Sequence, residues 1–144
     1  MSSDVFEHIP DAARAEAEVA RILKPGGTLI LAAECREGMP ANSPMDKMLR
    51  SVSGPEAVLA LVAASGEARP EQWQAQILAL IQRRANILVY SSLPDEVIRA
   101  AHLKPCRDIA ATVTETLKKL GNQARVAVLP QGPLTIPYLK SNAN

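Results

Sequence analysis

The sequence is poor in aromatic residues and has no excess of charge of either sign. Aromatic side chains make up 3% of its 144 residues, and its phenylalanine, tryptophan and two tyrosines are far apart. They cannot form the stacking surface that binds single-stranded nucleic acid. Sixteen Lys and Arg balance fifteen Asp and Glu to a net charge of +1, with both signs mixed along the chain. No basic surface for nucleic acid is therefore expected.

Cysteine, histidine and long hydrophobic runs are scarce as well. Cys35 and Cys106 lack CxxC spacing, so neither a disulfide framework nor a zinc site is expected, and a reduced, cytoplasmic compartment is favoured. His8 and His102 have no partner at a metal-ligand spacing, so we expect no metal site and no catalytic residue in this chain. No signal peptide and no run of about 18 apolar residues is present, which predicts a soluble chain without a membrane segment.

Hydrophobic residues nevertheless make up 47% of the chain, enough for one well-packed core. We expect residues 1–144 to form a single α/β domain of small, Rossmann-like type, with a mostly parallel sheet flanked by helices and right-handed crossovers. The run at 28–33 is apolar on both faces, as a covered parallel strand requires. The predicted strands are 28–33, 87–90 and 125–129, and the predicted helices are 11–23, 46–52, 55–64, 73–84, 94–101 and 109–120.

Two features of this pattern bear on function. Trp73, Ile77, Leu80 and Ile81 share a helical stripe, which favours a core role for Trp73, although the glutamines around it favour a site or interface. The pair Gly26-Gly27 follows a helix and precedes a strand. This is the reverse of the order in a phosphate-binding loop, so we interpret the pair as a turn that ends the helix.

The segment 34–38 is the best candidate for ligand binding. It directly follows the predicted strand 28–33, and open α/β sheets collect ligand-binding residues at the carboxyl ends of their strands. Arg36 can hold a carboxylate through two hydrogen bonds, and Glu34 can orient the guanidinium. Position alone leaves a solvated loop of mixed charge as an equal alternative.

Four sequence blocks, in this order along the chain, resemble the C-terminal domain of the lactate racemase family. They cover residues 24–38, 71–77, 99–109 and 128–139. The resemblance implies racemisation or epimerisation of small 2-hydroxy acids, by hydride removal and return, with a nickel-pincer nucleotide in the intact enzyme. It also implies that the catalytic histidines, the lysine tethered to the cofactor and the nickel-ligating histidine belong to a larger N-terminal domain. We therefore expect this chain alone to hold no cofactor and to be inactive.

The resemblance also suggests individual site residues. The family has a Gln and a Lys, three residues apart on the helix before the Gly-Gly pair, that help to hold the substrate. Counting back from Gly26 without gaps places them at Asp11 and Arg14, so the amide is lost and a cation is kept. The family tryptophan near the cofactor matches Trp73. The expected substrate-binding residues are Asp11, Arg14, Glu34 and Arg36, and Trp73 is the expected cofactor contact.

These observations predict the substrate-side domain of a 2-hydroxy acid isomerase, acting with an N-terminal domain in cis or in trans. The altered residues Asp11 and Arg14 suggest an alternative, a stand-alone interaction or small-ligand module that has lost the reaction. A third interpretation is a methyltransferase fragment, because residues 4–31 resemble the segment that follows the S-adenosylmethionine site in those enzymes. The glycine-rich strand, turn and helix that bind that cofactor would have to precede this segment.

Overall fold

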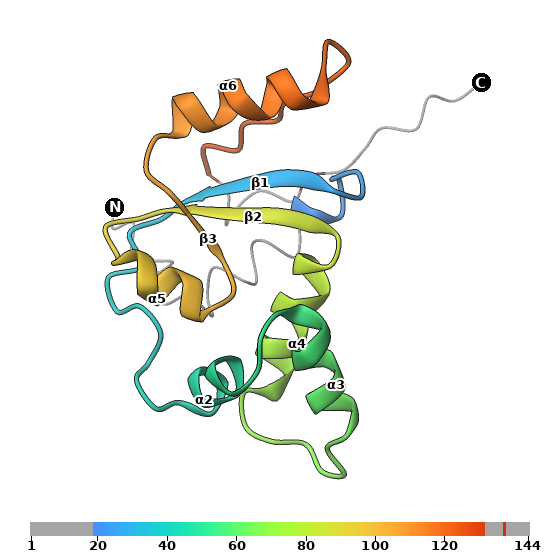
Figure 1. Cartoon of the computed structure of the whole chain (residues 1–144), viewed down its shortest axis with the longest axis vertical. Helices are drawn as coiled ribbons and strands as arrows, with labels where there is room; N and C mark the ends of the chain where they lie inside the picture. The colour runs from blue at the N-terminus through green and yellow to red at the C-terminus, as the bar shows by residue number, and fades with distance from the viewer. Residues whose placement is uncertain (1–18, 132–136, 138–144) are drawn as a thin grey trace, which may run out of the picture.

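Three parallel strands in the order β1-β2-β3 form the sheet, and helices flank it (Figure 1). The structure, a computed structural model, describes residues 19–131 and residue 137. Its elements are β1 (Gly27–Ala32), α2 (Pro44–Ser51), α3 (Pro55–Ala63), α4 (Gln72–Gln82), β2 (Ala85–Tyr90), α5 (Asp95–Ala100), β3 (Lys104–Cys106) and α6 (Ile109–Leu120). The predicted α/β fold class is confirmed. Of the predicted helix 11–23, residues 11–18 lie outside the described residues, and the described part is helical only at residues 19 and 20.

The core forms where β1 and β2 meet helices α2 to α5. Along β2, alternate residues are buried, as expected for a strand with one face on the core. Leu29 of β1 pairs in register with Ile87 of β2, and both are buried. The largest fully buried side chains come from these strands and from the helices around them: Met45, Leu49, Val58, Leu78, Val89 and Ile98.

Gly26 and Gly27 form the turn that leads into β1, which is the structural role that the sequence predicts for them. Gly26 has a φ of +77°, in the left-handed region that favours glycine, and its N–H donates to the carbonyl of Arg84 at 2.7 Å. A Cβ on Gly27 would lie 2.9 Å from the carbonyl oxygen of Lys24, too close for a side chain. Within the described residues, no helix is long and apolar enough to cross a bilayer.

The predicted strand 125–129 is wrong, and the third strand is β3 instead. Residues 125–129 have no regular secondary structure, and Val126 and Val128 are 60% and 79% exposed. An alternating apolar pattern describes side chains only, whereas a strand also needs a neighbour for its backbone. β3 has only three residues and contains Pro105, which is tolerated because β3 pairs with β2 alone among the described strands.

The predicted inward stripe of α4 is also partly wrong. Trp73 and Leu80 are 52% and 45% exposed, whereas Ala75, Leu78 and Ala79 are buried. Because α4 is apolar around most of its circumference, periodicity could not identify the face that meets the core.

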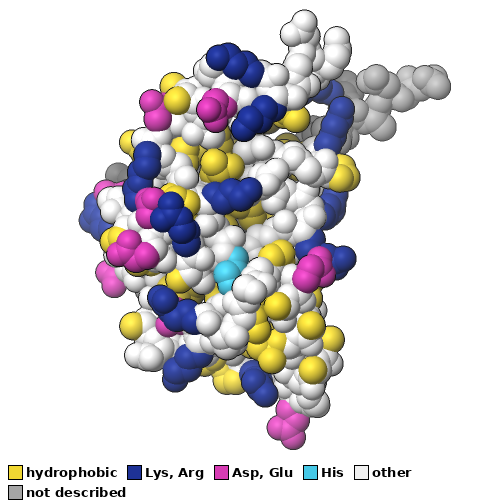
Figure 2. All heavy atoms as spheres, in the orientation of Figure 1, with side chains coloured by type: hydrophobic (Ala, Val, Ile, Leu, Met, Phe, Trp, Pro, Cys, Tyr) yellow, Lys and Arg dark blue, Asp and Glu magenta, His cyan; other side chains and the backbone are white. Residues whose placement is uncertain are grey.

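Helix α6 has no buried residue among its twelve positions. In Figure 2, hydrophobic side chains also reach the surface around α3 and α4.

Candidate functional site

A cavity of about 230 Å³ lies near the carboxyl ends of β1 and β2. The loop after β1 forms one wall, Asp46 and Arg50 of α2 form another, and Leu93 and Val97 from the β2–α5 segment form a third. The lining combines apolar side chains with two arginines and two carboxylates. The lining residues are Arg36, Glu37, Gly38, Met39, Ala41, Asp46, Arg50, Leu93 and Val97.

The structure brings Glu34 and Arg36 together. The Arg36 Nε donates to a Glu34 carboxylate oxygen at 2.5 Å, and both side chains are largely exposed. Cys35 between them is fully buried with a φ of +49°, so the backbone turns there while its neighbours reach solvent. Of this pair, Arg36 lines the cavity. Glu34 is placed to orient the guanidinium.

The α2 wall of the cavity is organised around a buried carboxylate. Ser43 caps α2 by accepting a hydrogen bond from the N–H of Asp46 at 3.1 Å. Asp46, only 8% exposed, accepts from the Asn42 N–H at 3.2 Å and from the Arg50 guanidinium at 2.7 Å. The sequence analysis did not identify Asp46 and Arg50, because neither belongs to a recognisable motif.

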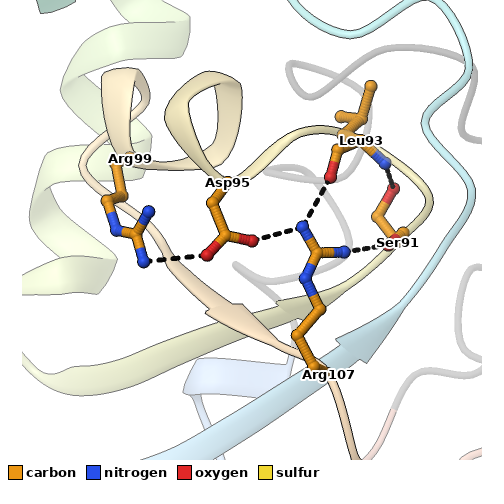
Figure 3. A network of polar contacts seen from close by, with 5 residues as sticks. All are labelled: Ser91, Leu93, Asp95, Arg99 and Arg107. Carbon is orange, nitrogen blue, oxygen red and sulfur yellow. Dashed lines mark hydrogen bonds and ion pairs between the residues drawn. The ribbon is translucent and has the colours of Figure 1, made fainter.

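A second polar cluster lies beside this cavity, at the carboxyl ends of β2 and β3 (Figure 3). Arg107, directly after β3, binds the carbonyls of Ser91 and Leu93 and the carboxylate of Asp95. Asp95 also pairs with Arg99 at 2.8 Å, one turn further along α5. The hydrogen bond from Arg107 lowers the pKa of Asp95 below its ordinary value of 3.8, and the charge of Arg99 acts in the same direction.

Sequence reasoning missed Arg107 for a specific reason. It follows β3, which has only three residues and contains a proline, so that the sequence pattern does not indicate a strand there. Had β3 been predicted, Arg107 would have stood at the carboxyl end of a parallel strand, like Glu34 and Arg36. The position of Arg107 in the sequence could therefore have identified it as a site residue. That inference requires β3, which the hydrophobic pattern does not indicate.

Trp73 lies in the first turn of α4 and does not line the cavity that contains Arg36. Just before α4, the Glu71 carboxylate accepts a hydrogen bond from the Met45 N–H at 3.0 Å, which connects the start of α4 to α2. The half-exposed indole is accessible to a ligand or a second domain. The predicted substrate residues Asp11 and Arg14 lie outside the described residues.

The described residues do not fit the role of nickel ligands. In the part of the chain that the structure describes, no group of three or more His, Cys, Asp and Glu is placed to hold a metal ion. Cys35 and Cys106 form no disulfide, and both are buried. No chemical step on a nickel cofactor is therefore assigned to these side chains.

Comparison with known proteins identifies the family. The lactate racemase C-terminal domain matches residues 7–136, which is most of the chain. A search of curated proteins gave no match. The solved lactate racemase apoprotein from Thermoanaerobacterium thermosaccharolyticum has a similar fold, with a TM-score of 0.78 and 22% sequence identity over 90% of this chain. The match covers 32% of that longer protein. The chain thus belongs to the lactate racemase C-terminal domain family.

Proposed function

We propose that this chain is the substrate-side domain of a 2-hydroxy acid racemase or epimerase, and that it is not catalytic alone. The observation that carries the proposal is the family match over residues 7–136. The proposal requires an N-terminal domain, in cis or in trans, because the match covers only a third of the solved lactate racemase. All of residues 1–144 would then serve as one α/β domain beside that partner.

The cavity at the sheet edge supports a role in substrate binding. Arg36 at its rim can bind the carboxylate of a small 2-hydroxy acid, while Glu34 fixes the direction of the guanidinium. The apolar lining formed by Met39, Leu93 and Val97 suits the alkyl part of such an acid. Asp11 and Arg14 remain predicted contacts of the same substrate.

The cofactor of the intact enzyme would be shared with the N-terminal domain. A nickel-pincer nucleotide, when bound, supplies hydride removal and return at the hydroxyl-bearing carbon. Trp73 is the residue of this chain that we propose as its contact, because the half-exposed indole offers a flat apolar surface. The nickel ligands and the catalytic bases are assigned to the N-terminal domain.

The proposal places the chain in the cytoplasm, with a small 2-hydroxy acid and the N-terminal domain as its partners and without a role at nucleic acid or membranes. The two cysteines form no disulfide, which agrees with a reducing compartment. The methyltransferase alternative is not favoured, because the family match begins at residue 7 and includes nearly all of segment 4–31. Nothing in the structure favours a stand-alone module over the two-domain enzyme.

Reconstitution in trans tests this proposal. The purified chain is mixed with the cofactor-loaded N-terminal domain of a lactate racemase, and conversion of L-lactate to D-lactate is followed by chiral chromatography. We expect racemisation by the mixture and none by this chain alone. Racemisation by the isolated chain would overturn the proposed division of roles.

A variant pair connects that activity to the cavity. Arg36→Ala is expected to raise the KM for lactate about tenfold or more, because a charge-assisted contact contributes roughly 1.5–3 kcal/mol. Lys47→Ala removes a nearby exposed cation of α2 that does not line the cavity, and it should leave KM unchanged. Equal effects of the two substitutions would argue against Arg36 as a substrate contact.

A further inference from the structure

One guanidinium joins the loops that follow β2 and β3 (Figure 3). The two terminal nitrogens of Arg107 donate to the carbonyl oxygens of Ser91 and Leu93, each at 2.8 Å. The nitrogen that reaches Leu93 also donates to the Asp95 carboxylate. Arg107 thus satisfies two backbone acceptors and one side-chain acceptor of a single tight loop.

The connection continues from the β2 loop to the β1 loop. The Ser91 hydroxyl donates to the carbonyl oxygen of Glu34, and its oxygen also accepts the Leu93 N–H at 3.3 Å. Because the strands are parallel, the loops that follow them leave the sheet at the same edge. A continuous series of hydrogen bonds therefore runs from Arg107, after β3, to Glu34, after β1.

Two residues next to this series line the cavity, Leu93 and Arg36. Leu93, whose carbonyl Arg107 holds, is a buried wall residue, and Arg36 stands two positions after Glu34. Arg107 itself does not line the cavity. Any effect of Arg107 on a ligand bound there must therefore pass through the two loops.

The geometry explains why an arginine is needed. Its planar fork presents several N–H groups in fixed directions, whereas a lysine ammonium is a single point of charge on a flexible stem. Asp95 would keep Arg99 as an ionic partner if Arg107 were removed, but the Ser91 and Leu93 carbonyls would each lose a donor. The loop conformation, rather than the charge of Asp95, is what depends on Arg107.

We propose that Arg107 is a positioning residue that fixes the 34–38 and 91–95 loops at the edge of the candidate substrate cavity. The functional part of this inference rests on the proposed binding of a 2-hydroxy acid there. Its structural part, the coupling of two loops through one side chain, is independent of the identity of the ligand.

Hydrogen exchange of the full chain tests the coupling. Arg107→Ala and Arg107→Lys are compared with Arg99→Ala, which removes the other cation of Asp95 but touches neither carbonyl. The amide of Gly38, bonded to the Cys35 carbonyl at 2.7 Å, reports on the β1 loop. Both Arg107 variants should accelerate exchange at least threefold in 91–95 and in 34–38, and Arg99→Ala in neither. Acceleration confined to 91–95, or equal effects of Arg99→Ala, would overturn the coupling.

Kinetics of the reconstituted enzyme test the consequence for the site. Both Arg107 variants should raise the KM for lactate about tenfold with kcat within twofold, since they disturb substrate binding and not the reacting groups. Arg107→Lys should fail to restore KM although it keeps the charge, and full restoration would contradict the role of the fork. If the unmodified chain supports no racemisation, the proposed function fails while hydrogen exchange still decides the role of Arg107.

Discussion

Single charged side chains at the sheet edge act mainly through the atoms they hold in place. Arg107 is half exposed and the Arg36 and Glu34 side chains are largely exposed, so their ionic contacts contribute little to stability. Their role is to orient other groups, because Arg107 holds two carbonyl groups and Glu34 holds a guanidinium. The buried carboxylate of Asp46 has the same function on the opposite wall.

Asp95→Asn should make the stability of the chain less dependent on pH. Because Arg107 lowers the pKa of Asp95 in the folded state, the folded protein binds this proton less tightly than the unfolded chain does. The stabilisation by the carboxylate is therefore present above pH 3.8 and is lost as pH falls through the lower folded-state pKa.

Thermal unfolding between pH 2.5 and 7 measures this effect. The unmodified chain should have a higher Tm than Asp95→Asn at pH 7, and the two values should converge at the acid end. Glu115→Gln, at an exposed position of α6, serves as the control and should follow the unmodified chain. A gap in Tm that stays constant across the range would show that Asp95 does not act through its charge.

At the scale of elements, the sequence predicts the helices and strands that have a clear side-chain pattern. It misses those that depend on pairing with a neighbouring strand. β1 and β2 were found because they are apolar runs bounded by turns, and helices α2 to α5 were found from spacing and capping residues. β3 was missed because it is short and contains a proline, and the role of Arg107 was missed with it. The apolar pattern at 125–129 predicts a strand, but these residues have no regular secondary structure.

Two leucine substitutions test which helices form the core. Leu78 of α4 is fully buried, so Leu78→Ala should lower the free energy of unfolding by about 2–5 kcal/mol. Leu120 at the end of α6 is 55% exposed, so Leu120→Ala should change it by less than about 0.5 kcal/mol. Urea unfolding measures both values. A large loss from Leu120→Ala would show that α6 packs against the domain, contrary to the structure.

The whole molecule has the fold and family of a lactate racemase C-terminal domain but only a third of the length of the solved enzyme. Its surface keeps apolar side chains that this chain does not cover, including Trp73 and Leu80 on α4. The candidate cavity at the sheet edge is lined in part by arginines and carboxylates, whereas the described residues contain no cluster of potential metal ligands. These properties agree with one wall of a site that a second domain completes.

A chimeric enzyme tests this account most directly. Residues 7–136 of this chain replace the C-terminal domain of the Thermoanaerobacterium thermosaccharolyticum lactate racemase, and the cofactor-loaded chimera is assayed for racemisation of a panel of small 2-hydroxy acids. The account predicts racemisation of at least one acid, which is weakened by Arg36→Ala and unaffected by Lys47→Ala. A folded, nickel-loaded chimera that racemises none of them would contradict the proposal that this domain provides the substrate side of the site.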